Sequence, residues 1–319
     1  MLGRGYDKVR SPAVSADLLL KLVAIFVVIA IGFAAGRARL VGPTAADTLS
    51  AATFTIFAPA LLFRTMAGIE LADLPWRMLA VYFVPTVLLL LGCYAWQRWR
   101  GVDAVASVVR GLAVTFSNMV QLGIPLMTAL FGMAGLTLHI ALISLHALIL
   151  LTMATVLAEV NRAGPVRARI AQTVRRSVIH PVTLPILLGL GYNAAGLPLP
   201  ALADEVLATL GVAVVPLSLV TIGLSLAQYG LRDSGRTAAG LALTKLVAHP
   251  LLVLAAAWLV GLHGLPLIVA VLCAALPTGA NVLLFAGRYG THQAEATATI
   301  VLATVAFAAT VTAWLFVLI

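Results

Sequence analysis

Ser117-Asn118-Met119-Val120-Gln121-Leu122-Gly123-Ile124-Pro125 interrupts an otherwise apolar segment at residues 113–131. A second interruption, Leu276-Pro277-Thr278-Gly279-Ala280-Asn281, lies in the apolar segment at residues 272–287. Hydrocarbon offers no water to backbone groups that leave a regular helix, so an interruption inside a membrane is costly. Two interruptions in corresponding places of two halves therefore indicate a role other than anchoring.

The composition of the chain indicates whether it lies in water or in lipid. Hydrophobic residues make up 62% of the 319 residues and charged residues 10%, whereas soluble domains carry about 25% charged residues. The length allows about ten spans of roughly 20 residues each. We therefore expect an all-α polytopic membrane protein lying almost entirely in a lipid bilayer. The net charge of +9 does not indicate nucleic-acid binding, because no polar domain is present to carry a basic face.

Ten spans are expected, at about residues 18–36, 45–66, 76–96, 107–132, 136–160, 178–197, 202–227, 237–262, 266–287 and 294–319. Residues 1–16 form a polar tail, and a signal peptide there is a weaker alternative because the run that follows is long enough to span. Residues 161–177 hold five arginines and are expected to form a basic cytoplasmic linker. This linker divides the chain into residues 1–160 and 178–319, with five spans in each half.

The distribution of lysine and arginine predicts the orientation. Loops after the odd-numbered spans hold thirteen arginines, while the opposite side holds six basic residues. Basic loops favour the cytoplasmic side, so both termini are expected outside the cytoplasm. The arginine-rich composition suggests a bacterial source, and hence the bacterial inner membrane.

An inverted repeat is expected, because an odd number of spans in each half forces the halves into opposite orientations. A shift of about 160 residues aligns two pairs of prolines, Pro59 with Pro216 and Pro85 with Pro250. The same shift aligns the polar interruptions, Asn118 with Thr278 and Gln121 with Asn281.

The interruptions suggest an anion site. Pro277 lacks a backbone donor, so a helix is expected to break there, and Pro125 is expected to mark the first break. The N-terminal end of each downstream half-helix carries roughly half a positive charge, which suits an anion. A lone amide in a membrane helix more often bonds a neighbouring helix. Four polar residues at matched positions favour a substrate site that binds a carboxylate, formed by Asn118, Gln121, Thr278 and Asn281.

Lys245 is the one cation well inside an expected span, with His249 one turn further on. Ionisable groups at this depth are functional candidates, so Lys245 could pair with the substrate or carry a proton together with His249. The alternative is that Lys245 reaches an interface or bonds helix carbonyls. No carboxylate lies at mid-depth, and no enzyme motif or metal-ligand spacing is present, so we expect neither catalysis nor a cofactor.

Five motifs in this order resemble the auxin efflux carrier family, which includes plant carriers and bacterial malonate or malate permeases. They are Phe57-Ala58-Pro59-Ala60-Leu61-Leu62-Phe63, Ser117-Asn118 with Gly123-Ile124-Pro125-Leu126, Pro216 with Gly223-Leu224-Ser225-Leu226, Lys245-Leu246-Val247-Ala248-His249-Pro250, and Ala275-Leu276-Pro277-Thr278-Gly279-Ala280-Asn281.

The resemblance implies ten helices in two inverted repeats, like the bile-acid/sodium symporters, with the broken fourth and ninth helices crossing. It also implies a scaffold of spans 1, 2, 6 and 7, a moving transport unit of spans 3–5 and 8–10, and a homodimer. Asn118 would then be the substrate ligand at the crossing. Ser117, which stands where plant carriers have proline, joins the candidate substrate-binding residues and leaves the geometry of the first break open.

These observations predict a secondary transporter that moves a small organic anion by elevator-type alternating access, with possible proton or sodium coupling. A sodium-coupled symporter of the bile-acid type is one alternative, and a membrane sensor that transports nothing is another.

Overall fold

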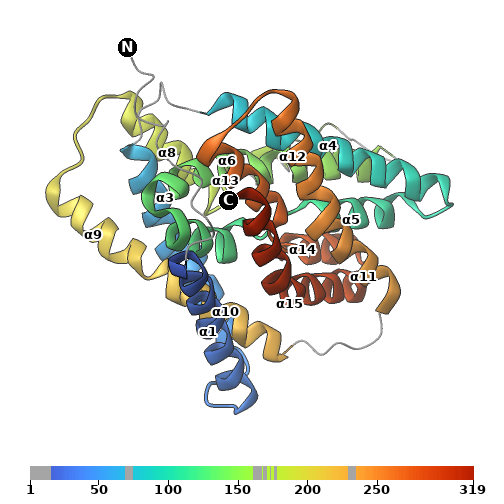
Figure 1. Ribbon diagram of the computed structural model, residues 1–319, viewed down its shortest axis with the longest axis horizontal. Coiled ribbons are helices and arrows are strands. Elements are labelled where there is room, and N and C mark those ends of the chain that lie inside the picture. Colours follow the sequence, from blue (N-terminus) through green and yellow to red (C-terminus); the bar gives the residue numbers. More distant parts are fainter. Residues whose placement is uncertain are drawn as a thin grey trace.

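The computed structural model describes residues 16–68, 75–160, 178–228 and 235–319, together with residues 167, 171–172 and 174–175. These described residues form helices and contain no β-strand (Figure 1). Seven helical segments among them are long and apolar enough to cross a membrane: Ala16–Arg37, Ala45–Ala67, Trp76–Trp99, Met119–Glu159, Ala201–Gln228, Gly235–Leu259 and Gln293–Leu318. The prediction of an all-α polytopic membrane protein is confirmed. The count of ten spans and their inverted relationship stay predictions.

The first half of the chain contains α1 (Ala16–Arg37), α2 (Ala45–Ala52), the π-helical segment η1 (Thr53–Phe57), α3 (Ala58–Ala67), α4 (Trp76–Trp99), α5 (Ala104–Thr115), the π-helical segment η3 (Met119–Gly123) and α6 (Ile124–Glu159). A kink divides α6 at Gly132, whose φ of 61° suits glycine. The kink coincides with the expected boundary between the spans at residues 107–132 and 136–160.

The second half contains α8 (Thr183–Ala194), α9 (Ala201–Val212), α10 (Val214–Gln228), α11 (Gly235–Leu243), the π-helical segment η4 (Thr244–Ala248), α12 (His249–Leu259), α13 (Gly264–Ala275), α14 (Asn281–Tyr289) and α15 (Gln293–Leu318). The predicted basic linker at residues 161–177 and the polar tail at residues 1–16 lie largely outside the described residues.

Within the described residues, each of the three π-helical segments directly precedes a proline in the first turn of the next helix. Pro59 follows η1, Pro125 follows η3 and Pro250 follows η4. A proline ring collides with the carbonyl group four residues earlier, and a wider turn relieves this collision without ending the helix. Pro125 therefore does not break its helix, contrary to the sequence-based expectation. The first break lies further upstream, at residues 116–118.

Close backbone contacts join helices from the two halves. Gly223 of α10 lies against the backbone of Ile29 and Phe33 in α1, and no Cβ would fit there. Gly189 of α8 lies in the same way against the backbone of Phe63 in α3. Small residues let membrane helices approach closely enough for extensive van der Waals contact. Helix α1 thus packs on α10, and α3 packs on α8.

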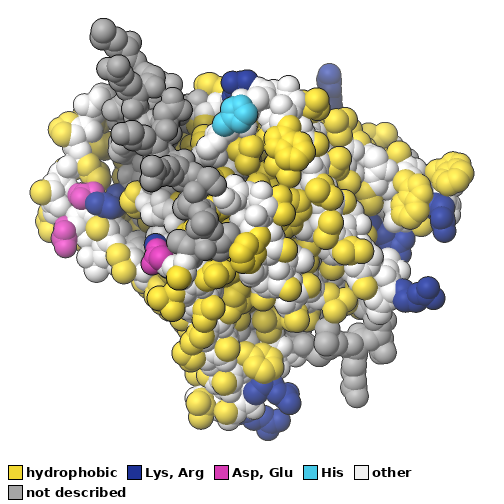
Figure 2. All heavy atoms as spheres, in the orientation of Figure 1, with side chains coloured by type: hydrophobic (Ala, Val, Ile, Leu, Met, Phe, Trp, Pro, Cys, Tyr) yellow, Lys and Arg dark blue, Asp and Glu magenta, His cyan; other side chains and the backbone are white. Residues whose placement is uncertain are grey.

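Two groups of helices are visible in Figure 1. Helices α1, α3, α8, α9 and α10 lie toward the left and bottom, while α4, α5, α11 and α12 lie toward the right. Apolar side chains cover most of the face drawn in Figure 2, and charged side chains stand mainly near its edges. The exposed rings of Trp76 and Trp99 mark the two ends of α4. Aromatic residues at helix ends are typical of the two membrane–water interfaces.

Candidate functional site

Two short stretches of extended backbone interrupt the helices where polar residues interrupt the sequence. Helix α5 ends at Thr115, and Phe116 then adopts an extended conformation before η3 begins at Met119. Helix α13 ends at Ala275, with Leu276 at φ −54° and ψ 146°, and α14 begins at Asn281. Both expected interruptions are therefore present.

The two interrupted stretches pair with each other. The backbone N–H of Asn118 donates to the carbonyl oxygen of Pro277 at 2.8 Å, and the N–H of Gly279 donates to the carbonyl oxygen of Phe116 at 2.9 Å. Ser117 and Thr278 thereby face each other as an isolated antiparallel bridge. Each break supplies partners for backbone groups that the other break has released, which is how an irregular backbone can persist away from water.

Thr278 does not occupy the position expected of a substrate ligand. Its side chain is fully buried, and its Oγ1 donates to the carbonyl oxygen of Ala113 at 2.8 Å. That carbonyl belongs to the last turn of α5, where carbonyl groups lack partners within the helix. Thr278 therefore caps the helix end of the opposite break instead of facing a cavity.

Two histidines of α6 hold the first break in place. The N–H of Ser117 donates to Nε2 of His146 at 3.1 Å, and Nδ1 of His146 lies 3.3 Å from the hydroxyl of Tyr82. Nε2 of His139 lies 2.8 Å from the carbonyl oxygen of Met119. None of these three side chains was among the predicted site residues.

Lys245 and His249 lie behind the second break. Nζ of Lys245 donates to the carbonyl oxygen of Ala274 at 2.5 Å and lies 3.3 Å from Nδ1 of His249. Nε2 of His249 lies 2.8 Å from Oγ1 of Thr86. Both Lys245 and His249 are fully buried. Lys245 therefore faces the negative end of the α13 dipole in this conformation.

A cavity of about 470 Å³ lies against the crossing. On the crossing side its lining includes Ser117, Asn118, Gln121 and Asn281, which are four of the predicted substrate-binding residues. Neither Lys245, His249, Thr278 nor Pro277 lines it. The opposite wall comes from the start of α2, residues 180–182 and the end of α10, with Asp47, Ser50, His180 and Ser225 among its polar members.

The crossing side of the cavity combines carboxamide side chains with the N-terminal ends of two helices. η3 and α14 both begin at the cavity wall, so the positive ends of their helix dipoles lie beside it. The side chains of Asn118 and Asn281 have no hydrogen-bond partner within the described part of the chain, and Nε2 of Gln121 donates to Oγ of Ser50 at 3.2 Å. Two positive helix ends and free carboxamides in one cavity suit a small anion.

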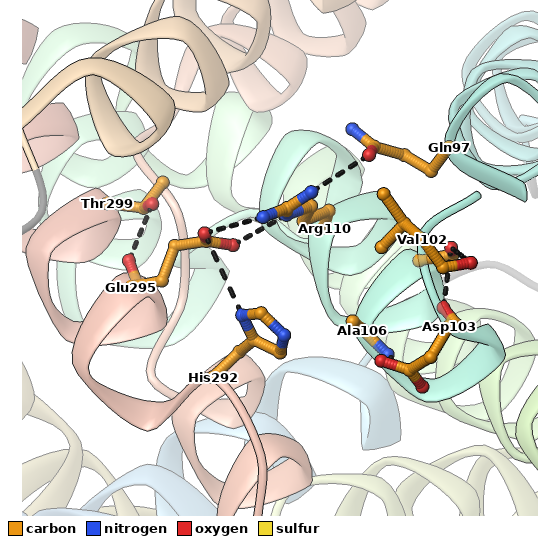
Figure 3. A network of polar contacts seen from close by, with 9 residues as sticks. Gln97, Val102, Asp103, Ala106, Arg110, His292, Glu295 and Thr299 are labelled. Atoms are coloured by element: carbon orange, nitrogen blue, oxygen red, sulfur yellow. Dashed lines mark hydrogen bonds and ion pairs between the residues drawn. The ribbon is translucent and has the colours of Figure 1, made fainter. Parts of the chain in front are cut away.

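Away from the cavity, a network of polar side chains joins α5 to α15 (Figure 3). The guanidinium group of Arg110 makes two hydrogen bonds with the carboxylate of Glu295, at 2.8 and 2.9 Å, and a third with Oε1 of Gln97. The Arg110 and Glu295 side chains are only 16% and 14% exposed, so solvent screens this pair weakly. The network braces the upstream half of the first broken helix.

No cluster of three potential metal ligands occurs within the described residues.

The apolar helices and the crossing breaks define a membrane transport protein. The family model described as "Membrane transport protein" matches residues 17–315. The chain therefore belongs to this family, the auxin efflux carrier family of multi-pass membrane transporters, and the predicted resemblance is confirmed. Such a transporter has a small-molecule substrate and is not an enzyme.

Two relatives illustrate the relationship. An "Uncharacterized transporter" from Methanothermobacter thermautotrophicus (strain ATCC 29096 / DSM 1053 / JCM 10044 / NBRC 100330 / Delta H) is 26% identical over 263 residues, which cover 81% of this chain and 84% of the relative. A "Putative malonate transporter" from Rhizobium meliloti (strain 1021) is 33% identical over 146 residues, which cover 45% of each chain.

Proposed function

We propose that this protein is a secondary transporter of a small organic anion and that the substrate binds through a carboxylate at the crossing of the two broken helices. One observation carries the proposal: two helix N-termini and the carboxamides of Asn118, Gln121 and Asn281 line the same cavity. Its volume of about 470 Å³ lies within the range of about 300–1,000 Å³ typical of small-molecule pockets. The relative named as a malonate transporter supports a carboxylate substrate.

The transport mechanism in this proposal is elevator-type alternating access. The cavity lies between two sets of helices, with α2, α10 and residues 180–182 on one side and the broken helices, α6 and α15 on the other. The scaffold comprises α1 to α3 and α8 to α10, and the moving unit comprises α4 to α6 and α11 to α15. Substrate would cross the membrane when the moving unit carries the crossing past the scaffold.

The proposed inverted repeat would produce the same division. In the proposed repeat, α1 of the first half corresponds to α8 of the second, and α3 corresponds to the α9–α10 pair. The observed contacts are consistent with this correspondence, because α1 packs on α10 while α3 packs on α8. The two broken helices, α5–α6 and α13–α14, occupy equivalent places in the two halves. Sites at the interface of inverted repeats are typical of secondary transporters.

We propose that the protein lies in a bacterial inner membrane as a homodimer, with both termini outside the cytoplasm and the basic loops inside. Coupling to a proton or sodium gradient would drive the transport.

Uptake into proteoliposomes tests the proposal. Purified protein would be given radiolabelled malonate, succinate, lactate and acetate, with and without imposed proton or sodium gradients. The proposal expects saturable uptake of at least one carboxylate above that of empty liposomes. Stimulation by sodium alone would favour the bile-acid type of symporter. If correctly folded protein transports no carboxylate under any gradient, the proposal fails and a sensor role becomes the better account.

A further inference from the structure

The cavity holds a negative charge on the wall opposite the two helix ends. Asp47 lies in the first turn of α2, is solvent-exposed and lines the cavity. No hydrogen-bond or ion-pair partner for its carboxylate exists among the described residues. No lysine or arginine is found among the described residues that line the cavity. Among the described residues nothing offsets the charge of this carboxylate, which is unexpected in the cavity of the proposed anion carrier.

Asp47 lies within a substrate's length of the crossing. Gln121, in the first turn of the helix after the break, donates to Ser50 at 3.2 Å. Ser50 and Asp47 are three residues apart in α2, so both lie on one face of that helix, about 5 Å apart along its axis. A molecule held at the first break would therefore extend toward the Asp47 carboxylate.

The two histidines that line the cavity do not offset Asp47. Nε2 of His146 accepts the N–H of Ser117, and its Nδ1 lies beside the Tyr82 hydroxyl, so the neutral ring satisfies both contacts. Nδ1 of His180 accepts the N–H of Val182 at 3.3 Å, which leaves a neutral ring with its proton on Nε2. Both imidazoles thus fit their surroundings as uncharged groups.

The positive character of the site suits one carboxylate. Each helix N-terminus contributes roughly half an elementary charge, so η3 and α14 together offer about one. Lys245 does not line the cavity, and its Nζ faces the carbonyl oxygen of Ala274. A second ionised carboxylate on the substrate would meet Asp47 with no lysine or arginine among the described lining residues, and like charges at short range repel.

We propose that Asp47 determines specificity by admitting substrates with a single negative charge: one carboxylate at the crossing and a neutral, hydrogen-bond-donating group facing Asp47. The substrate class is a monocarboxylate bearing a hydroxyl or amide, or a dicarboxylate with one carboxyl group protonated. This inference rests on the proposed transport function and narrows its substrate class.

Pairs of probes of nearly equal size, in which a neutral amide replaces one carboxylate, test the inference. Malonate and succinate would be compared with their half-amides, malonamate and succinamate, as competitors of carboxylate uptake into proteoliposomes at pH 8. At that pH the dicarboxylates carry two charges and the half-amides carry one. We expect each half-amide to compete about tenfold or more better than its dicarboxylate, a difference that one like-charge contact near a protein surface readily produces. Equal competition by the two members of both pairs would overturn the inference.

Substitutions separate a specificity role from a structural one. Asp47→Asn is expected to reduce the preference for half-amides about tenfold, largely by improving the binding of dicarboxylates, and Asp47→Glu is expected to keep the preference. Asp17→Asn is the matched control, because Asp17 also lies in the first turn of its helix but not in the cavity. If Asp47→Asn leaves the preference unchanged while transport continues, Asp47 merely stabilises α2. A complete absence of carboxylate uptake in the unmodified protein would instead reject the proposed transport function.

Discussion

The backbone N–H of Asn118 donates to the carbonyl oxygen of Pro277 at 2.8 Å, although the two residues lie in opposite halves of the chain. This bond, together with its partner from Gly279 to Phe116, lets each broken helix satisfy backbone groups of the other. The crossing keeps an irregular backbone within the apolar interior and presents two helix N-termini to one cavity. Structure and proposed chemistry therefore depend on the same pair of breaks.

The first prediction concerns the free carboxamides. Asn118→Ala and Asn281→Ala should each raise the substrate KM about tenfold or more, because a hydrogen bond to a charged carboxylate contributes about 1.5–3 kcal/mol. Thermal stability should change little, since neither side chain has a hydrogen-bond partner within the described residues. Uptake kinetics and thermal unfolding in detergent would be measured together.

Gln228→Ala is the matched control for these two variants. Gln228 also carries a carboxamide, but it donates to Pro43 and does not line the cavity. The Gln228→Ala variant should keep the substrate KM of the unmodified protein. Normal KM values in both asparagine variants would remove these residues from the site.

The second prediction concerns His146, which accepts the N–H of Ser117 at the first break. His146→Phe should leave that buried donor without a partner, at a cost of about 1–3 kcal/mol. We expect lower thermal stability and at least tenfold slower uptake. His146→Gln retains an acceptor and should recover much of both properties. His263→Phe, a change at an exposed histidine, should have no effect. Similar behaviour of the Phe and Gln variants would argue against the hydrogen bond.

The third prediction concerns Lys245, whose Nζ donates to the carbonyl oxygen of Ala274. Lys245→Met should destabilise the protein by about 1–3 kcal/mol, because that carbonyl loses its donor in the interior. Thermal unfolding of the purified protein measures this change, and Lys21→Met, at an exposed position paired with Asp17, serves as the control. An unchanged unfolding temperature for Lys245→Met would show that the bond contributes nothing, and would favour a role in ion coupling.

The fourth prediction concerns the contact between α1 and α10. Gly223→Ala should lower the yield of folded protein, because the added methyl group would collide with the backbone of Ile29 and Phe33. Gly92→Ala is the matched control, since Gly92 lies in α4 with open space around it. Size-exclusion profiles and unfolding temperatures would compare the two. Equal yields and stabilities would mean that the helices separate easily at this point.

Much of the architecture was predictable because a membrane limits the possibilities. Pro277 and the polar groups around Asn118 could be identified as interruptions, since polar and helix-breaking residues are expensive in apolar spans. The direction of individual side chains was not predictable. Thr278 matched the pattern of a ligand, yet a hydroxyl at a helix break can equally cap a helix end, and only the fold distinguishes the two.

The residues on the opposite wall of the cavity could not be predicted from the sequence, for a different reason. Asp47 and His180 stand near the ends of expected spans, where polar residues are ordinary. Only packing brings them opposite the crossing. The prediction that Pro125 marks the first break was wrong. Proline usually breaks a helix, but here a π-helical turn before Pro125 accommodates its ring.

Substrate protection at Ala280 tests the central claim most directly. Ala280 is exposed, lines the cavity and immediately precedes α14. Ala280→Cys would be introduced into a Cys93→Ala background, in which the remaining Cys273 is fully buried. The rate of labelling by a charged maleimide would be measured with and without a transported carboxylate, using Thr44→Cys as an exposed site outside the cavity. We expect the carboxylate to slow labelling of Ala280→Cys severalfold and to leave Thr44→Cys unchanged. Equal labelling of Ala280→Cys with and without a saturating, transported carboxylate would contradict binding at the crossing.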